Sequence, residues 1–390
     1  MKRALLATLV LCMLVAESRV LAAEPIARGA AIGSAYGTLA GGAEGLWWNP
    51  AVLGSPILGS AALGLTLQGG NNALTLNQLR GIVQDDATAK AEAVTAIEKK
   101  GRWDTRVEAV GGAAVSVMGF SVGVAPRIIV EALNVSPLLA KVALLGNVTL
   151  QPNSHYDVTG ENLRAVYNEI AIGYAHDLPI PVPGLSLSGG LAIKYYQGSD
   201  FERWKTDQHI DTGATASGSI ASSTHETATQ GTGYGVDLGL RGTVAGIVKC
   251  AIVVKNIGGA ITWTGKTESS NLNAAKTAFV TTTTLGDIKE KLPTQVTVGA
   301  SASIPVVGTA VAAALDVRTN PSETRAKVGL EQSIAILALR VGYVTAAGPE
   351  PGMLTFGVGL GALVARLDVA AGVSAGNKGG MLGASGTVSF

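Results

Sequence analysis

The sequence is poor in the residues that most often hold disulfides and metal sites. It contains two cysteines, Cys12 and Cys250, and the first lies in a segment that we expect to be removed, so no intrachain disulfide can form afterwards. The four histidines are scattered, one near an expected strand end and three in expected polar loops: His176, then His155, His209 and His225. Their spacing matches no metal-ligand motif, so we expect neither a metal nor a cofactor.

Two further deficits exclude other classes of protein. The apolar window from Ile128 to Leu150 is interrupted by Glu131, Pro137 and Lys141, so it does not predict a membrane-spanning helix. The net charge is only +1, which argues against a nucleic-acid partner. Yet 47% of the residues are hydrophobic and 51 are glycine, with only 5% aromatic. Such a chain must arrange its hydrophobic side chains in another pattern.

The first 23 residues have the order of a secretory signal peptide. The pair Lys2-Arg3 precedes an apolar run from Ala4 to Ala16, and small residues end the segment. This run has about 13 residues, fewer than the roughly 20 that a membrane anchor needs. We therefore expect export, with cleavage after Ala22 or Ala23.

Hydrophobic and polar residues then alternate with a period of two. From Gln295 to Ile304 every second side chain is apolar, and the residues between are Gln, Thr, Gly or Ser. The last ten residues alternate in the same way and end on Phe390. Because successive strand side chains point to opposite sides, each segment has one apolar and one polar face.

The polar faces also carry charges of both signs. If the apolar faces meet lipid, the polar faces line the lumen of a membrane barrel. The mixed signs would admit a polar cargo, or they would simply neutralise one another across neighbouring strands. The expected lumenal residues are Asp237, Arg241, Lys255, Asp316, Arg318, Lys327, Glu331, Arg340, Arg366 and Asp368.

A soluble β-sandwich would show the same alternation, and lengths separate the two folds. The segments have about 10 to 13 residues, which suits a tilted strand that crosses a bilayer, whereas sandwich strands have roughly 5 or 6. Short turns alternate with longer polar loops, of which the longest are Gly198–Gly231 and Gly259–Pro293. This asymmetry is typical of barrels in the outer membrane of Gram-negative bacteria. The sequence therefore predicts an all-β, closed antiparallel transmembrane barrel surrounded by outer-membrane lipid.

We predict about fourteen strands in residues 58–390. Their spans are 58–69, 105–117, 119–131, 167–178, 186–197, 232–242, 248–260, 294–304, 309–318, 324–333, 336–345, 352–362, 365–375 and 381–390. The terminal aromatic Phe390 looks like the signal that the barrel-assembly machinery reads. Leu74–Lys100 and part of Leu133–Leu150 predict helical insertions in external loops. A barrel this wide stays open unless something fills it, so we expect residues 24–57 to form a plug.

Three motifs carry a resemblance to a known family. The segment Glu44–Ala51, EGLWWNPA, resembles the hatch motif of the FadL-type superfamily of outer-membrane barrels. Thr232–Gly239 is similar to the Gly-rich central strand of that group, and Leu292-Pro293 resembles the start of its next long strand. The superfamily includes channels for fatty acids and aromatic hydrocarbons, together with PorV-like and TraF-like barrels.

The resemblance implies a plugged fourteen-stranded barrel that passes hydrophobic molecules, in some members sideways into the bilayer. It places Asn49, Pro50 and Ala51 in the hatch, and Trp47 and Trp48 in the lumen beside any apolar ligand. Two adjacent tryptophans offer a large apolar surface with two N–H donors. The same pair would also serve simply to pack the plug against the wall.

The sequence departs from fatty-acid channels in its external loops. Those channels catch substrate with apolar loops, whereas Gly198–Gly231 and Gly259–Pro293 are polar here, and apolar loop residues occur earlier, between Pro137 and Leu145. The segment Gly357–Ala362 touches a nucleotide-binding motif but lies inside an alternating strand. No catalytic constellation accompanies it, and we expect no enzyme.

Three hypotheses remain for the function. The first is a porin-like channel that transports small hydrophobic or amphipathic compounds across the outer membrane. The second is a barrel that binds a partner protein of a secretion or conjugation apparatus and transports no small molecule. The third is a structural outer-membrane protein.

Overall fold

The computed structural model describes residues 24–54, 58–146, 148–179, 182–212, 222–272, 279–319, 323–346 and 352–390. The expected signal peptide, residues 1–23, lies outside these ranges, as do residues 55–57 at the end of the expected plug. Among the described residues, no helix is long and apolar enough to cross a membrane.

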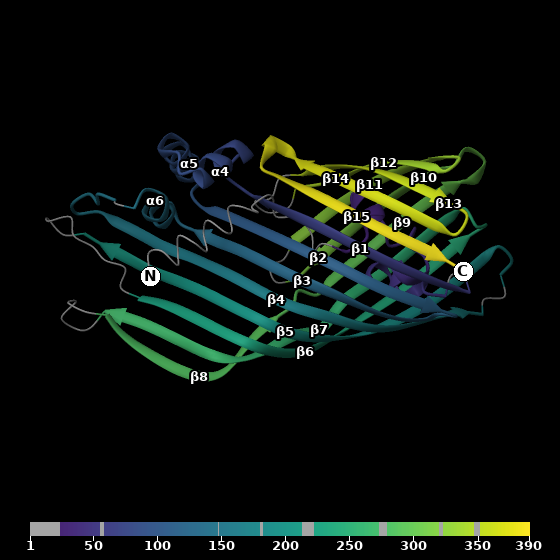
Figure 1. Cartoon of the computed structure of the whole chain (residues 1–390), viewed down its shortest axis with the longest axis horizontal. Coiled ribbons are helices and arrows are strands. Elements are labelled where there is room, and N and C mark those ends of the chain that lie inside the picture. The colour runs from purple at the N-terminus through teal and green to yellow at the C-terminus, as the bar shows by residue number, and fades with distance from the viewer. Residues whose placement is uncertain are drawn as a thin grey trace.

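Fifteen antiparallel strands form one sheet within the described ranges, and fourteen of them close it into a barrel (Figure 1). The strands are β1 (Gly59–Asn71), β2 (Trp103–Val117), β3 (Phe120–Val135), β4 (His155–Leu178), β5 (Leu185–Asp211), β6 (Ser222–Val244), β7 (Val248–Leu272), β8 (Phe279–Lys291), β9 (Gln295–Ile304), β10 (Thr309–Arg318), β11 (Glu323–Ile334), β12 (Leu337–Val344), β13 (Met353–Ala362), β14 (Ala365–Ser374) and β15 (Gly379–Ser389). Pairing of β15 with β1 closes the cylinder. The fifteenth strand is β8, which pairs with the outer half of β7, while β9 pairs with its inner half.

The fourteen-stranded closed barrel is therefore confirmed, and the strand positions agree closely with the alternation. The expectation that Gly198–Gly231 and Gly259–Pro293 are loops is wrong for their described parts, which extend β5, β6 and β7 and form β8. It is wrong for the histidines too, because His155, His209 and His225 lie in strands. Outside the membrane neither face must be apolar, so these threonine- and serine-rich stretches form strands without a hydrophobic alternation.

Strand length differs sharply between the two sides of the barrel. Strands β4 to β7 have 24, 27, 23 and 25 residues, and about 9 to 11 suffice to cross a bilayer. The short turns lie at the end that carries Phe390; Met118 and Gly119, for example, both have positive φ in the two-residue turn between β2 and β3. The long strands project from the opposite end (Figure 1).

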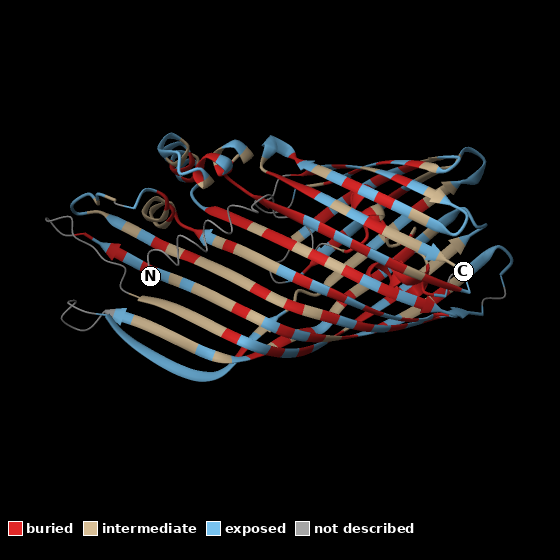
Figure 2. Cartoon of the chain, viewed as in Figure 1, coloured by how far each residue is buried: buried red, intermediate tan, exposed pale blue. Residues whose placement is uncertain are grey.

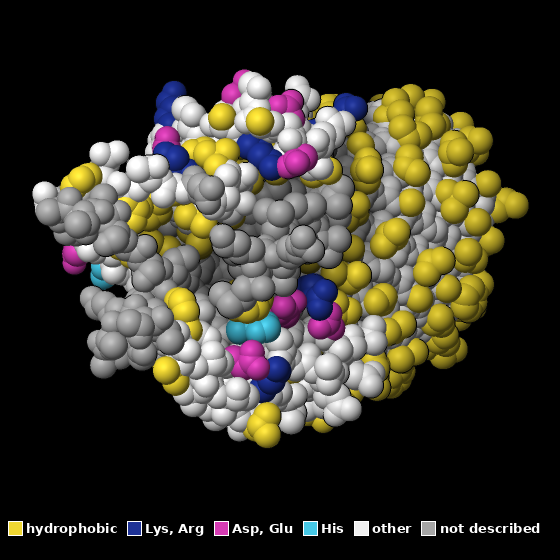
Figure 3. Space-filling model, turned by 60° about the vertical axis from the view of Figure 1, so that its left-hand side comes forward, with side chains coloured by type: hydrophobic (Ala, Val, Ile, Leu, Met, Phe, Trp, Pro, Cys, Tyr) yellow, Lys and Arg dark blue, Asp and Glu magenta, His cyan; other side chains and the backbone are white. Residues whose placement is uncertain are grey.

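The outer surface near the turns is apolar. In β14 Leu367 and Val369 are 67% and 56% exposed, whereas Asp368 between them is 2% exposed. This alternation of exposed and buried residues runs around the shorter strands (Figure 2). Figure 3 shows the resulting belt of hydrophobic side chains at one end of the molecule, with charged side chains gathered at the other. Exposed apolar side chains in such a belt face lipid.

Three helices lie outside the barrel wall and confirm the expected helical insertions. They are α4 (Leu76–Val83), α5 (Ala87–Lys100) and α6 (Pro137–Leu145). Thr75 and Gln78 form a capping box at the start of α4, and Asp86 caps α5. Short helical turns also follow β9 and β14, namely η3 (Pro305–Val307) and η4 (Ala375–Asn377).

The N-terminal segment, which we define as Glu24–Leu53, lies inside the barrel. It folds into four short helical turns: α2 (Ala27–Ala31), η1 (Gly42–Glu44), α3 (Gly45–Trp48) and η2 (Pro50–Val52). Its apolar residues, including Ile32, Leu46 and Val52, are fully buried and share one core with inward-facing residues of the wall. Those wall residues are small: Ala62, Val110, Ala114, Ala125, Ala171, Ala175 and Ala192.

Candidate functional site

The hatch motif forms a hydrogen-bonded turn inside the barrel. Asn49 has extended backbone angles, as the following proline requires. Its side-chain oxygen accepts a hydrogen bond from the Ala51 amide at 3.0 Å, and its side-chain nitrogen donates one to the Gly37 carbonyl at 3.0 Å. Pro50 begins η2, where it needs no N–H. Asn49, Pro50 and Ala51 are thus buried structural residues of this turn.

Glycines in the wall make room for this turn. A Cβ atom on Gly190 of β5 would lie 2.2 Å from the Pro50 carbonyl carbon, and one on Gly239 of β6 would lie 2.1 Å from Asn49 Oδ1. No real Cβ atom approaches so closely, so only glycine admits the backbone here. Gly239 is the last residue of the Gly-rich motif Thr232–Gly239, so two of the motifs that resemble the FadL-type family are in contact.

Trp47 and Trp48 are packed between the N-terminal segment and the wall. Trp47 is 1% and Trp48 7% exposed. The Trp48 ring meets Tyr36 edge-on at 5.3 Å, and the Lys255 ammonium lies 5.5 Å from its centroid. Both indole N–H groups are buried without a hydrogen-bond partner among the described residues. The pair packs the segment, and it presents two unused donors to the interior.

The structure places the ten expected lumenal charges on inner faces of their strands. Eight are buried, and Arg241 and Arg366 are half-buried. Three groups form. Asp237 and Lys255 lie in one group, Asp316, Arg318 and Lys327 in a second, and Glu331, Arg340, Arg366 and Asp368 in a third. Arg241 lies nearer the turn that joins β6 to β7.

Glu331 anchors the start of the N-terminal segment. Arg28 of α2 donates two hydrogen bonds to its carboxylate, at 2.7 and 2.8 Å. Arg340 donates a third at 2.6 Å and also pairs with Asp368 at 2.9 Å. Arg366 completes the group, 3.4 Å from Glu331 and 3.1 Å from Asp368. This set of five residues is called the Glu331 clamp below.

A second group of charges surrounds Glu24, and we call it the Glu24 clamp. Of its members, the sequence indicated only Asp237 and Lys255. Glu24 pairs with Lys255 at 2.6 Å and with Arg127 at 3.3 Å. The remaining pairs join Arg127 to Glu108 at 3.0 Å and Glu169 at 3.2 Å, and Lys194 to Glu169 at 3.1 Å and Asp237 at 2.8 Å. The signal available was a single charge within an otherwise apolar alternating stretch, as for Arg127 and Lys194.

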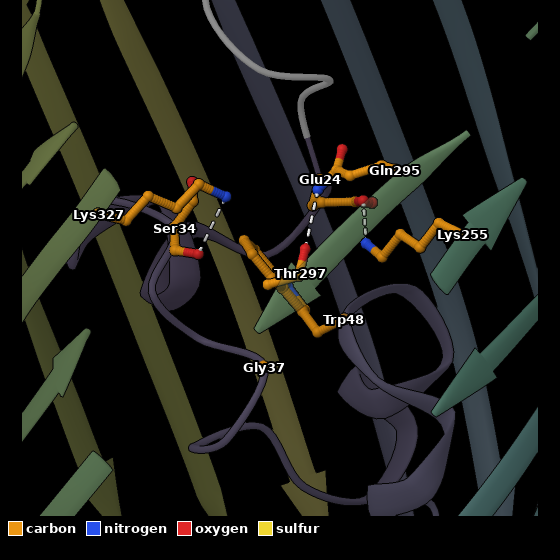
Figure 4. A pocket seen from close by; sticks show the side chains of 8 residues that line it. All are labelled: Glu24, Ser34, Gly37, Trp48, Lys255, Gln295, Thr297 and Lys327. Carbon is orange, nitrogen blue, oxygen red and sulfur yellow. Dashed lines mark hydrogen bonds and ion pairs between the residues drawn. The ribbon is translucent and has the colours of Figure 1, made fainter. Parts of the chain in front are cut away.

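A cavity of about 20 Å³ lies beside Trp48, bordered by Glu24, Lys255 and Lys327 (Figure 4). It can hold about one water molecule and no organic ligand. Lys327 pairs with Asp316 and donates a hydrogen bond to the Ser34 carbonyl at 3.5 Å.

On the side of the clamps away from Phe390, apolar side chains of β4 to β8 form a buried cluster on the inner face of the sheet. Trp263 of β7 is fully buried; its ring covers Gly198 and Gly231 and lies 5.0 Å from Phe201 of β5. Tyr167 and Tyr196 meet edge-on at 5.9 Å. We call this the outer aromatic cluster; its other members are Ala165, Ala228, Ile261 and Ile288. It comes largely from stretches that looked like polar loops, so the sequence did not reveal it.

Arg203 closes the outer aromatic cluster on its external side. Its guanidinium lies 5.5 Å from the Phe201 ring. It forms ion pairs with Glu226 of β6 at 2.6 Å and Glu290 of β8 at 2.8 Å. A single arginine on β5 thus ties two further strands together over the cluster.

The sequence matches no family model and no curated protein. Solved structures match it over nearly the whole length. The toluene transporter TodX of P. putida has a TM-score of 0.53 and 13% identity, covering 92% of this chain and 98% of its own. The toluene transporter TbuX of Ralstonia pickettii has a TM-score of 0.51 and 13% identity, covering 94% and 97%. A FadL homologue of Pseudomonas aeruginosa has a TM-score of 0.53 and 12% identity, covering 96% and 100%.

TodX and TbuX are both described as toluene transporters. Barrels of this kind lie in the outer membrane, and the apolar belt indicates that lipid surrounds this one. At such identities the likeness establishes the fold, and this chain therefore has the FadL-type outer-membrane barrel fold that its hatch motif indicated.

Proposed function

We propose that this protein passes small hydrophobic or amphipathic compounds across the outer membrane. The observation that carries the proposal is the outer aromatic cluster, which lies in the lumen of a fold shared with toluene transporters. Trp263, Phe201 and Tyr196 give an apolar, aromatic surface on the route inward from the cell exterior. Aromatic and aliphatic compounds would bind transiently to this cluster, because its side chains offer them apolar contacts that water does not.

Strand β5 orders the proposed path. From outside, it carries Arg203, then the cluster residues Phe201 and Tyr196, then Lys194 of the Glu24 clamp, and finally Gly190 beneath the hatch turn. A compound would thus meet an external ion-pair closure, an apolar region and a charged belt in that order. The last barrier is the N-terminal segment.

The segment 24–57 would act as the plug, and its movement would open the path. It is joined to the wall through small residues and ion pairs rather than through strand pairing. Two charged clamps hold it, and breaking ion pairs is less costly where water can enter to solvate the charges. Trp47 and Trp48 move with the segment and would expose their two N–H donors to the lumen.

A reversible crosslink tests whether the plug must move. The Ala27 Cβ atom lies 3.4 Å from the position of a Cβ atom on Gly383 of β15, near the roughly 3.8 Å typical of disulfides. The double variant Ala27→Cys/Gly383→Cys, made in a Cys250→Ser background, would lock α2 to the wall when oxidised. Uptake of labelled toluene and labelled fatty acid into proteoliposomes is then measured before and after reduction.

We expect uptake by the reduced protein and little uptake by the oxidised protein. Each single-cysteine variant under oxidising conditions is the matched control and should transport normally. Equal uptake in both redox states would show that plug movement is unnecessary. Failure of the unmodified protein to take up any of the compounds would contradict the transport function itself.

Changing Trp47 and Trp48 to alanine separates ligand contact from packing. If the indoles contact the transported compound, the double variant should lose uptake while ion leakage stays low. If they only pack the segment, uptake should persist and ion conductance in planar bilayers should rise. The reason is that removing two buried indole rings leaves a cavity and loosens the packing of the segment against the wall. Parallel measurements of uptake and conductance distinguish the two roles.

A second candidate function is binding of a partner protein, as part of a secretion or conjugation apparatus. It is favoured by the ordered outer strands β4 to β8 and by the small volume of the cavity beside Trp48, about 20 Å³. Crosslinking in intact cells that recovers one defined partner through the β5–β6 extension, with no uptake in proteoliposomes, would support this alternative.

The export route is part of the proposal. We infer removal of residues 1–22 or 1–23, which mass spectrometry of the purified protein tests directly. We also infer that Phe390 is read by the barrel-assembly machinery. Its backbone pairs with Gly59 through hydrogen bonds of 2.8 and 2.9 Å, and deletion of Phe390 should lower the amount of folded protein in the outer membrane.

A further inference from the structure

A short motif occurs twice in the outer extension of the barrel. His155-Tyr156-Asp157 begins β4, and His209-Ile210-Asp211 ends β5. The antiparallel register sets His155 opposite Asp211 and Asp157 opposite His209. Because residues two apart share a face of a strand, all four side chains gather on one face of this strand pair.

The four side chains are in direct contact. His155 Nδ1 lies 2.6 Å from Asp211 Oδ1, and His155 Nε2 lies 3.3 Å from Asp157 Oδ1. The same Asp157 oxygen lies 2.5 Å from His209 Nδ1. The two imidazole rings stack with centroids 5.3 Å apart. One carboxylate oxygen is thus shared by ring nitrogens from two strands.

We propose that His155, Asp157 and His209 bind one divalent transition-metal ion, such as Zn²⁺, Ni²⁺ or Cu²⁺. Their three nearest ligand atoms all lie within 4.8 Å of one another. Two imidazoles with one carboxylate are a ligand set that these ions favour, whereas Ca²⁺ and Mg²⁺ prefer oxygen ligands alone. This proposal does not rest on the proposed transport function.

The separation of one pair of ligand atoms suits tetrahedral coordination. With ligand bonds of about 2.0 to 2.1 Å, neighbouring ligand atoms lie roughly 3.3 Å apart, which is the separation of His155 Nε2 and Asp157 Oδ1. The His209–Asp157 contact must open by less than about 1 Å. Both side chains are free to do so, since they are 66% and 62% exposed.

Asp211 acts as a positioning residue in this arrangement. By accepting a hydrogen bond from His155 Nδ1, it leaves Nε2 as the nitrogen that faces Asp157. A carboxylate behind a ligating histidine orients the ring and increases its basicity. The fourth coordination position would face the adjacent groove of about 750 Å³, which His155, Asp157 and His209 line together with Pro137 and Leu138 of α6. A water molecule or an external ligand could occupy it.

The competing explanation is a pair of His–Asp ion pairs that only fasten the ends of β4 and β5. Such pairs would bind no metal with defined stoichiometry. The two explanations are separated by metal titration of the purified full-length barrel in detergent, made without a polyhistidine tag, in a Cys250→Ser background and stripped with a chelator. Calorimetry with Zn²⁺ gives affinity and stoichiometry, and electron paramagnetic resonance with Cu²⁺ counts coordinated nitrogens.

We expect one equivalent of metal with micromolar or tighter affinity, and Cu²⁺ spectra with coupling to two imidazole nitrogens. His155→Ala and His209→Ala should each abolish stoichiometric binding of Zn²⁺, and any Cu²⁺ that still binds at excess metal should couple to only one imidazole nitrogen. Asp211→Asn should keep both nitrogens but weaken binding by about 10- to 100-fold. His225→Ala removes a histidine that stacks on Trp204 in the neighbouring strand and should bind metal as the parent does.

The proposal is overturned if the parent protein binds no metal at micromolar concentration. It is equally overturned if both His155→Ala and His209→Ala bind as the parent does. Retention of heat-modifiable migration on gels shows that each variant is still a folded barrel, so that a loss of binding reports on the site.

Discussion

At the scale of single residues, this barrel is defined by what its inner wall omits. The apolar wall residues that share a core with the N-terminal segment are six alanines and one valine, and the bulky apolar side chains of that core belong to the segment itself. Gly239 shows the consequence most clearly, because the backbone of β6 and the amide of Asn49 approach each other too closely for any side chain. Charges hold the segment at two points, through Arg28 in the Glu331 clamp and through Glu24 in the Glu24 clamp.

We therefore predict that Gly239→Val loosens the plug. Its Cβ atom would lie 2.1 Å from Asn49 Oδ1 and 3.0 Å from the Ala51 nitrogen, an overlap that costs about 1 to 3 kcal/mol where a neighbour can shift. The expected result is higher ion conductance in planar bilayers. The matched control is Gly242→Val on the same strand, where a Cβ atom would meet only a Leu187 methyl at 4.0 Å. If both variants conduct alike, the close contact has no role in sealing.

A second residue-scale prediction concerns the Glu331 clamp. Glu331→Gln would leave Arg28, Arg340 and Arg366 with less than their neutralising charge in a buried site. Removing one partner of a buried ion pair typically costs about 3 to 5 kcal/mol. We expect a lower unfolding temperature and faster proteolysis after Arg28. Lys266→Gln is the control, since its ion pair with Glu268 is exposed and should contribute little.

At the scale of elements, the outer halves of β4 to β7 together with β8 form the part of the barrel outside the membrane. They surround the outer aromatic cluster with Trp263, and β7 pairs with β8 in this outer part and with β9 in the inner part. The outer part is held closed by Arg203, which contacts β6 and β8 from β5. Access to the lumen would thus depend on a few contacts between strand ends.

Arg203→Gln should accordingly speed the entry of hydrophobic compounds. Without the guanidinium, Glu226 and Glu290 lose their shared partner and repel each other, so β6 and β8 separate over the cluster. The measurement is the initial uptake rate of labelled toluene, which should rise several-fold. Arg164→Gln is the matched control, because its 2.7 Å pair with Asp200 joins β4 to β5 on the opposite face of the sheet from the cluster residue Phe201. A slower rate in Arg203→Gln would mean that Arg203 guides entry instead of closing it.

At the scale of the whole molecule, the barrel and the N-terminal segment are held by different kinds of contact. Every strand of the barrel pairs with other strands, and the sheet closes through β1 and β15 without the N-terminal segment. The segment adds no strand to the sheet; it is held by side-chain packing, by ion pairs and by hydrogen bonds between its backbone and wall side chains such as Ser60 and Thr355. The barrel wall and the N-terminal segment inside it are therefore distinct parts of one chain.

Deletion of residues 24–53 from the exported chain should give a folded barrel with a permanently open pore. A barrel of fourteen strands is wide enough to leave an aqueous channel when nothing fills it. Single-channel recordings should show conductance steps many times larger than those of the intact protein. Unchanged conductance would place the seal in the outer part of the barrel, at Trp263 and Arg203, and not in the plug.

The sequence alone determined the features that repeat with the period of a strand. Leu367 and Val369 face lipid and Asp368 faces the lumen because a strand inside a membrane has only these two sides. The hatch turn and the caps of α4 and α5 are local for the same reason: Asn49-Pro50-Ala51, Thr75 and Asp86 act on backbone within three residues.

Only the tertiary structure decided which distant side chains meet. Trp263 reaches Phe201, and His155 reaches His209, through strand register across polar stretches whose alternation is weak because both faces contact water or protein. Arg28 finds Glu331, 303 residues away, because closure of the barrel encloses the N-terminal segment. A pattern of period two identifies the face of a residue, but its neighbour on the next strand depends on turn lengths and on how the sheet closes.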